Sequence, residues 1–266
     1  ASTMGMATAR KTLLEGSTVR NIFTGNSGYM GLMAARLVEC GFTGLADGPG
    51  TIYTGVLSET FDPARVVSRL GEEWLVTKGY YKLHPTGRYV HAALDALEDA
   101  KSKLPGGHLD PALIDRIDVR AYKLAAMLDG REIDSSFGAR FSIPFALSTI
   151  LHHGGSSLAA FEDAAVANPL IRETARRVFV VEDTGHTAAY PETQRCDLLI
   201  TLTDGRVLRG HCEVMKGEPQ NPHSPEELRA KFFALGRAVW GEARTERLWE
   251  QCMTIERVPD VAALDL

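Results

Sequence analysis

The chain has 266 residues, a length that accommodates one large domain or two modest ones. With 44% hydrophobic and 24% charged residues it has the composition of a globular protein, which excludes collagen-like and disordered chains. A formal net charge of −5 without a basic block argues against a nucleic-acid partner. No apolar run approaches the roughly 18 residues that a membrane helix needs, so we expect no membrane partner either.

The four cysteines are scattered along the sequence, at Cys40, Cys196, Cys212 and Cys252. They show neither a metal-ligand spacing nor a disulfide framework, so we expect reduced thiols and no metal site. The first residues lack the basic and apolar regions of a signal peptide, which favours a cytoplasmic protein. They have the composition of the middle of a small-residue helix, so we expect the chain to be part of a larger assembly or polypeptide.

Helices dominate the prediction for the first hundred residues, at 1–15, 27–40, 62–70 and 89–103. The helix at 27–40 has apolar residues at the i, i+3, i+4, i+7 spacing and ends before Gly41. The segment 78–88 is aromatic and is interrupted by Pro85, which predicts a loop. The glycines at 25, 28 and 31 lack a preceding strand and the spacing of a phosphate-binding loop, so we expect no nucleotide site there.

The middle of the chain alternates between strands and helices. Strands are predicted at 117–127 and 179–182, and helices at 139–153, 157–166 and 169–178. The turn pair Asp204-Gly205 predicts a β-hairpin with strands at 196–203 and 206–215. Helix resumes after Ser224, an N-cap followed by proline and acidic residues, and again at 245–252. This order predicts an α+β block with a small antiparallel sheet, flanked by helical segments.

The segment from Tyr80 to His91 has the highest density of chemically active side chains in the sequence. A lysine that is desolvated among aromatic residues has a lowered pKa and becomes able to accept a proton. We therefore select Lys82, with His84 and His91, as candidate catalytic residues. Arg88 carries the planar guanidinium that matches a carboxylate, and it is a candidate for binding an acidic substrate. The same composition is also typical of a solvated basic loop with aromatic packing.

A second polar cluster, at 18–26, precedes the helix at 27–40. The backbone N–H groups at that helix start, together with Arg20, suit an anion. A simple capping turn fits the same residues, so both interpretations stay open.

Four ordered segments resemble the MmgE/PrpD family, which includes 2-methylcitrate dehydratase, cis-aconitate decarboxylase and iminodisuccinate epimerase. The first resembles the family signature K-x-x-P-C-C-R-Y-T-H-x-A-x-D-A, and the other three resemble later blocks of the family. They are Lys82-x-x-Pro85-x-x-Arg88-Tyr89-x-His91-x-Ala93-x-Asp95-Ala96, then 139–145, then 178–183, then 216–222 with 226–232. Four matches in order are much more specific than one.

The resemblance implies that this chain is the C-terminal part of a family member. The implied fold is an all-helical domain, completed by a missing N-terminal part, with an inserted α+β lid domain. The corresponding division is 1–77 for the first helical part, 78–222 for the lid and 223–266 for the returning helical part. The family site acts on small di- or tricarboxylates without a metal or organic cofactor. We therefore expect a polycarboxylate substrate, no cofactor, and a homodimer or an N-terminal helical chain as partner.

Residues are carried over from the family by position. Lys82 matches the lid lysine implicated in catalysis. Three further positions match the family pattern K-x-L-H-x-G. Arg20 stands where many members have its lysine, Phe23 replaces its histidine, and Gly25 matches its glycine. Phe145 stands where decarboxylases carry a tyrosine, although its place on an apolar helix is also typical of core packing. The substrate-binding residues implied by resemblance and composition together are Arg20, Phe23, Gly25, Arg88, Tyr89 and Phe145. The two phenylalanines remove polar groups, which argues against decarboxylation of cis-aconitate.

These expectations combine into a dehydratase-like lyase that abstracts a proton α to a carboxylate. Lys82 would be the base or would stabilise the developing enolate, and Arg20 and Arg88 would hold carboxylates. An isomerase is the alternative, because returning the proton to the other face needs no leaving group. A non-catalytic subunit or fragment that docks onto an N-terminal helical half is the third hypothesis.

Overall fold

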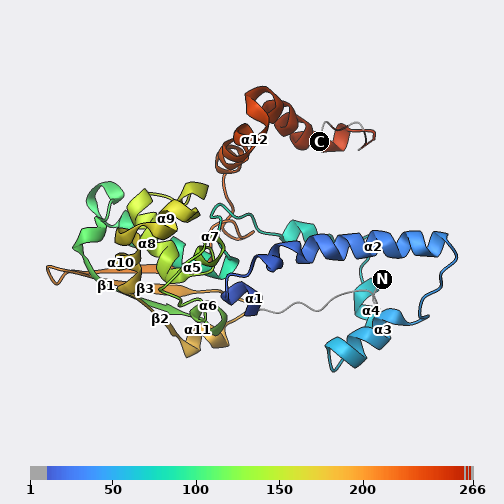
Figure 1. Ribbon diagram of the computed structural model, residues 1–266, viewed down its shortest axis with the longest axis horizontal. Coiled ribbons are helices and arrows are strands. Elements are labelled where there is room, and N and C mark those ends of the chain that lie inside the picture. The colour runs from blue at the N-terminus through green and yellow to red at the C-terminus, as the bar shows by residue number, and fades with distance from the viewer. Residues whose placement is uncertain (1–10, 261, 263, 265–266) are drawn as a thin grey trace.

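A computed structural model describes residues 11–260, 262 and 264 of the chain. Most of the helix predicted at 1–15 lies outside the described residues, and α1 covers Lys11–Leu14. The other elements follow in chain order (Figure 1): α2 (Phe23–Glu39), α3 (Gly48–Ile52), α4 (Pro63–Val67), α5 (Arg88–Ser102), β1 (Ile114–Ala121), α6 (Lys123–Ala126), α7 (Ser136–Ala139), α8 (Ile143–His153), α9 (Asp163–Ala167), α10 (Pro169–Arg176), β2 (Val178–Glu182), α11 (Thr184–Ala188), β3 (Cys196–Leu202), β4 (Val207–Cys212) and α12 (Pro225–Met253).

The four strands form one sheet in the order β2-β1-β3-β4. β1 runs parallel to β2 and antiparallel to β3, and β3 pairs antiparallel with β4. The sheet is therefore mixed, and the expectation of a purely antiparallel sheet is wrong. The connection from β1 to β2 passes through the helices α6 to α10, and a crossover of that length lets both strands run in the same direction. The hairpin predicted at Asp204-Gly205 is confirmed.

Two predicted elements are shorter than expected. β1 ends at Ala121 because the next residues, Lys123–Ala126, are good helix formers and build α6. The helix expected at 139–153 is divided, since α8 has its own start at Ser142. The Ser142 hydroxyl accepts a hydrogen bond of 2.9 Å from the Phe145 N–H, and a proline occupies the first turn, where its missing N–H costs little.

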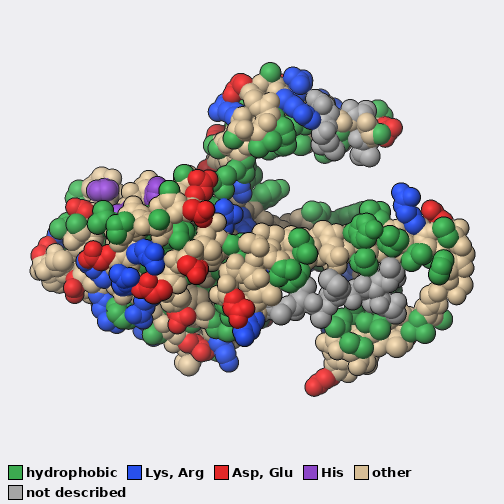
Figure 2. Space-filling model, in the orientation of Figure 1, with side chains coloured by type: hydrophobic (Ala, Val, Ile, Leu, Met, Phe, Trp, Pro, Cys, Tyr) green, Lys and Arg blue, Asp and Glu red, His purple; other side chains and the backbone are tan. Residues whose placement is uncertain are grey.

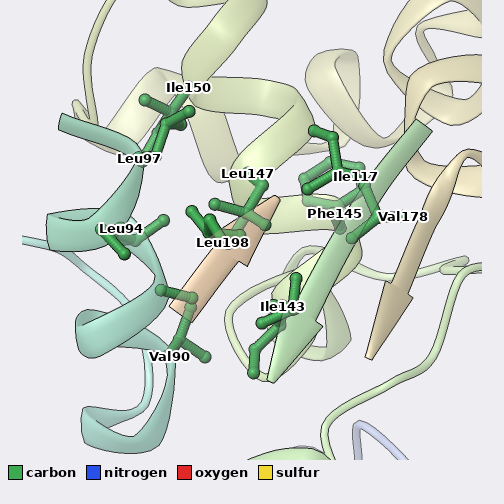
Figure 3. Close-up of a cluster of buried hydrophobic side chains, with 14 of the residues drawn as sticks. Val90, Leu94, Leu97, Ile117, Ile143, Phe145, Leu147, Ile150, Val178 and Leu198 are labelled. Carbon is green, nitrogen blue, oxygen red and sulfur yellow. The ribbon is translucent and has the colours of Figure 1, made fainter. Parts of the chain in front are cut away.

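The core lies on one face of the sheet, beneath α5 and α8. Side chains of β3 alternate between buried and partly exposed, as expected for a strand that is covered on one side. The helix α5 approaches β4 so closely that a Cβ on Gly210 would lie 1.9 Å from the Ala96 carbonyl oxygen. Figure 3 shows the side chains that fill this layer: Val90, Leu94 and Leu97 of α5, Ile143, Phe145, Leu147 and Ile150 of α8, and Ile117, Val178 and Leu198 of the sheet. The predicted α+β fold class is confirmed.

α2 and α12 extend away from the sheet and its covering helices (Figure 1). α12 begins with the predicted cap at Ser224 and is kinked at Gly241, whose φ of 73° interrupts the helix before the second helix expected at 245–252. α2 exposes large apolar side chains, with Leu32 70% and Val38 66% accessible. Figure 2 shows apolar side chains along α2 and over the segment that holds α3 and α4. Most of the exposed large apolar side chains lie between residues 14 and 81.

The division of the chain at 77/78 and 222/223 stays a prediction. Among the described residues, no helix is both long enough and apolar enough to cross a membrane.

Candidate active site

A cavity of about 960 Å³ lies where the segment before α5 meets the α7–α8 turn, the start of α2 and the segment 190–194. It brings together five of the predicted site residues: Arg20, Phe23, Lys82, Arg88 and Tyr89. The remaining lining is contributed by Tyr80, Pro85, Thr86, Gly87, Leu128, Phe137, Arg140, Phe141, Tyr190 and Gln194. The cavity therefore combines four cationic side chains with aromatic walls, a composition that suits a small anion.

The segment that carries Lys82 is held at both ends. The Tyr81 N–H donates to the Gly217 carbonyl at 3.0 Å, and the Gly87 N–H donates to the Arg140 carbonyl at 2.8 Å. The Lys82 carbonyl itself accepts a hydrogen bond from the Lys231 ammonium of α12. The segment is thus a loop, as predicted, but one that its neighbours fix in place.

Lys82 is the half-buried amine of the cavity. Burial lowers its pKa, and the positive charges of Lys231 and Arg88 lower the pKa further. Each effect disfavours the ammonium form, so the neutral amine becomes available at a lower pH than in a free lysine. This shift is the property required of a proton acceptor.

Arg88 lines the cavity, but most of its donors are already committed. Its Nη2 pairs with the Glu218 carboxylate, its Nη1 lies 3.3 Å from the His91 Nδ1, and the guanidinium stacks 4.1 Å above the Tyr80 ring. Arg88 therefore ties the start of α5 to the segment around Glu218. Its positive charge still acts on Lys82, and its Nε has no hydrogen-bond partner in the described structure.

The two histidines selected from the sequence do not line this cavity. His91 is 1% exposed, and burial, with the nearby His84, Arg88 and Lys82, lowers its pKa to about 2. Each of these effects favours the neutral form of the imidazole. His84 turns to another cavity, where its Nδ1 is 2.6 Å from the Ser156 hydroxyl and its Nε2 is 3.7 Å from Asp95. Neither histidine therefore lines the cavity of Lys82, and a catalytic role for either one stays a prediction.

Two predicted substrate-binding residues are also placed elsewhere. Gly25 is on α2, outside the cavity lining, with open space where a Cβ would be. Phe145 is 1% exposed in the core, because the Ser142 cap turns it beneath α8 toward the Phe161 ring. The apolar pattern around Phe145 already indicated core packing, and only the family position suggested a substrate contact. Arg20 and Phe23 do reach the cavity, with the guanidinium 5.8 Å from the phenyl ring.

Outside the segment from Tyr80 to His91, three polar lining residues were not predicted from the sequence: Arg140, Tyr190 and Gln194. Arg140 lies within a segment that resembles the family, so a basic residue beside an aromatic one there was a usable signal. No local pattern marks Tyr190 or Gln194, which reach the cavity through the turn before β3. Gln194 accepts a hydrogen bond from the buried Tyr122 hydroxyl at 3.1 Å, which fixes the orientation of its amide.

Among the described residues, no group of three or more His, Cys, Asp or Glu side chains is arranged to hold a metal ion.

Comparison with known proteins adds to this geometry. The family model described as "MmgE/PrpD C-terminal domain" matches residues 84–255. A cis-aconitate decarboxylase of Mus musculus is 25% identical over 251 residues, covering 90% of this chain and 50% of the relative. The same enzyme of Homo sapiens is 23% identical with the same coverage, and the cis-aconitate decarboxylase-like protein oryM of Aspergillus oryzae is 23% identical over 92% of this chain and 53% of its own length. The chain spans about half the length of the curated relatives it matches.

Proposed function

Because the chain belongs to the MmgE/PrpD family, we propose that it forms the lysine-bearing part of a lyase that acts on a small di- or tricarboxylate. The observation that carries this proposal is a half-buried lysine with a lowered pKa in a cavity that also holds three arginines. Such a cavity attracts a polyanion and offers it a neutral amine. The names of the relatives support the lyase class.

The proposed reaction begins with removal of a proton from the carbon next to a carboxylate. The neutral Lys82 amine accepts the proton, and the electron pair of the broken C–H bond moves into the carboxylate to give an enediolate. The positive charges of the cavity stabilise this dianionic group more than the substrate carboxylate, which is the condition for catalysis. The electron pair then returns to form the double bond, and the hydroxyl on the neighbouring carbon leaves as water with the proton that Lys82 had accepted.

An isomerase is the alternative use of the same side chains. If the proton returns to the opposite face of the enediolate, the product is an epimer with unchanged formula. Decarboxylation, the reaction named for the relatives, differs again, because it releases carbon dioxide. Mass and chirality of the product distinguish the three reactions. Since Phe145 lies in the core, Phe23 is the one of the two phenylalanine replacements that lines the cavity.

Small polycarboxylates are expected to stabilise the chain, whereas NAD and ATP are not. The cavity is cationic, and the sequence lacks a phosphate-binding loop, so a ligand with two or three carboxylates fits it better than a nucleotide. A ligand that binds only the folded state raises the unfolding temperature with its concentration. Thermal-shift screening of citrate, tricarballylate, glutarate, NAD and ATP tests this. Stabilisation by a nucleotide and by no carboxylate would contradict the proposal.

The chain is further expected to be stable only as an oligomer or with a helical partner. Apolar side chains exposed along α2 and over residues 42–81 form a larger surface than monomeric proteins ordinarily leave in water. Helices supplied by a second copy or by an N-terminal chain would cover it, and would also close the cavity beside Arg20. Sedimentation of the purified chain tests this expectation. A compact, monodisperse monomer with full activity would overturn this expectation. It would also exclude the third hypothesis, that the chain is a non-catalytic subunit.

A further inference from the structure

Arg140 lies in a turn that lines the cavity next to the Lys82 segment. It follows the last residue of α7, and its carbonyl accepts the hydrogen bond from Gly87. The two segments pack closely at this point, since a Cβ on Gly87 would lie 2.7 Å from the Phe141 ring. Two residues later, the Ser142 hydroxyl donates to the Gly130 carbonyl at 2.5 Å and caps α8. The backbone that carries Arg140 is thus fixed relative to the Lys82 segment.

Arg140 differs from Arg88 and Lys231, two other cations of this region, in that its guanidinium has no partner among the described residues. Arg88 pairs with Glu218, and Lys231 donates to the Lys82 carbonyl. The Nε of Arg140 is buried without a hydrogen-bond partner, and within the part of the chain that the structure describes no carboxylate pairs with its guanidinium. Buried donors in folded proteins are nearly always satisfied, so an unsatisfied one on a cavity wall indicates a ligand.

We propose that Arg140 is the specificity-determining residue that receives a second carboxylate of the substrate, one that does not react. This inference rests on the proposed function, in which Lys82 takes the proton next to the reacting carboxylate. The guanidinium offers two parallel N–H donors, which match both oxygens of a carboxylate. Gln194, whose carbonyl oxygen is occupied by Tyr122, has its NH₂ group available as a further donor on the same cavity. A substrate with one carboxylate would leave the Arg140 charge unpaired.

The experiment compares Kd values of tricarballylate and of butanoate, followed through the amide chemical shifts of the assembled protein. Arg140→Gln is expected to weaken tricarballylate binding about ten- to a hundredfold, the effect of losing a charged hydrogen-bond pair. Butanoate binding is expected to stay unchanged, because its single carboxylate sits at Lys82. The Kd of Arg140→Lys for tricarballylate should lie between those of the unaltered protein and Arg140→Gln, since an ammonium keeps the charge but lacks the paired donors. Arg206→Gln, in the exposed hairpin turn, serves as the matched control and should change neither Kd.

The outcomes separate this inference from the function on which it rests. If the unaltered protein binds no tricarballylate, the proposed function fails, and the role of Arg140 fails with it. If the unaltered protein binds tricarballylate and Arg140→Gln binds it equally well, the function stands and the role of Arg140 is overturned. An equal loss for tricarballylate and butanoate would place Arg140 at the reacting carboxylate and overturn the specificity role. The unfolding temperature of unliganded Arg140→Gln should match that of the unaltered protein, because the lost guanidinium has no partner.

Discussion

Lys82→Met is expected to lower kcat of the assembled enzyme by about 10²- to 10⁴-fold, the usual contribution of a general base. Methionine has nearly the same length and fills the same space, so the cavity keeps its shape while it loses the proton acceptor. The desolvation and neighbouring charges that lower the pKa of Lys82 have no counterpart on a thioether. Steady-state kinetics with the substrate identified by screening measure the effect.

Folding should be unaffected or slightly improved by this substitution. A lysine whose pKa is lower in the folded than in the unfolded state is harder to keep charged when the protein is folded. Its ammonium form therefore lowers the free energy of unfolding. That penalty is present below the pKa of the folded state and fades as the pH rises toward the ordinary lysine value. Methionine removes it, and chemical denaturation at pH 7 checks the result.

The pH dependence and a matched control complete the test. Activity of the unaltered enzyme should rise with pH up to the lowered pKa of Lys82, because only the neutral amine accepts a proton. Lys78→Met, a nearby exposed lysine paired with Glu73, should keep both kcat and this profile. A Lys82→Met variant with the kcat of the unaltered enzyme would exclude Lys82 as the essential base.

Phe145→Ala is expected to reduce the free energy of unfolding by about 3–5 kcal/mol, as large-to-small changes in packed cores do. The ring is 1% exposed, lies 6.3 Å from the Phe161 ring, and fills the layer between α8 and the sheet (Figure 3). Alanine leaves a void that the surrounding strands and helices cannot collapse into. Because single domains are stable by only about 5–15 kcal/mol, the loss should be visible as a large shift of the urea midpoint.

Two further variants distinguish a core role from a substrate contact. Phe145→Tyr adds a hydroxyl to a ring that is buried in the core beside the Phe161 ring, so it should destabilise the fold by about 1–3 kcal/mol. Leu113→Ala, at an exposed position, should change stability by less than about 0.5 kcal/mol. If Phe145→Tyr instead altered KM while leaving the unfolding midpoint unchanged, Phe145 would belong to the binding site and not to the core.

The sequence by itself determined the turns and helix starts that depend only on residues adjacent in the chain. Asp204-Gly205 specified its hairpin because few residue pairs suit such a tight turn, and Ser224 specified the start of α12 because its hydroxyl caps the helix. The dense segment around Lys82 identified a candidate site, and the family resemblance agrees with the match over residues 84–255. The apolar pattern around Phe145 also indicated its burial, against the expectation taken from the family position.

Other properties were decided only by the tertiary structure. The parallel pairing of β1 with β2 depends on how a long helical crossover returns to the sheet, and no residue in either strand encodes it locally. Lys82 and Arg140 are far apart in the sequence, yet both line one cavity, where the Gly87 N–H donates to the Arg140 carbonyl. His91 is buried in α5 and does not line the Lys82 cavity, and burial lowers its pKa. Desolvation and charge pairing depend on what surrounds a side chain, and that environment comes from segments distant in the sequence.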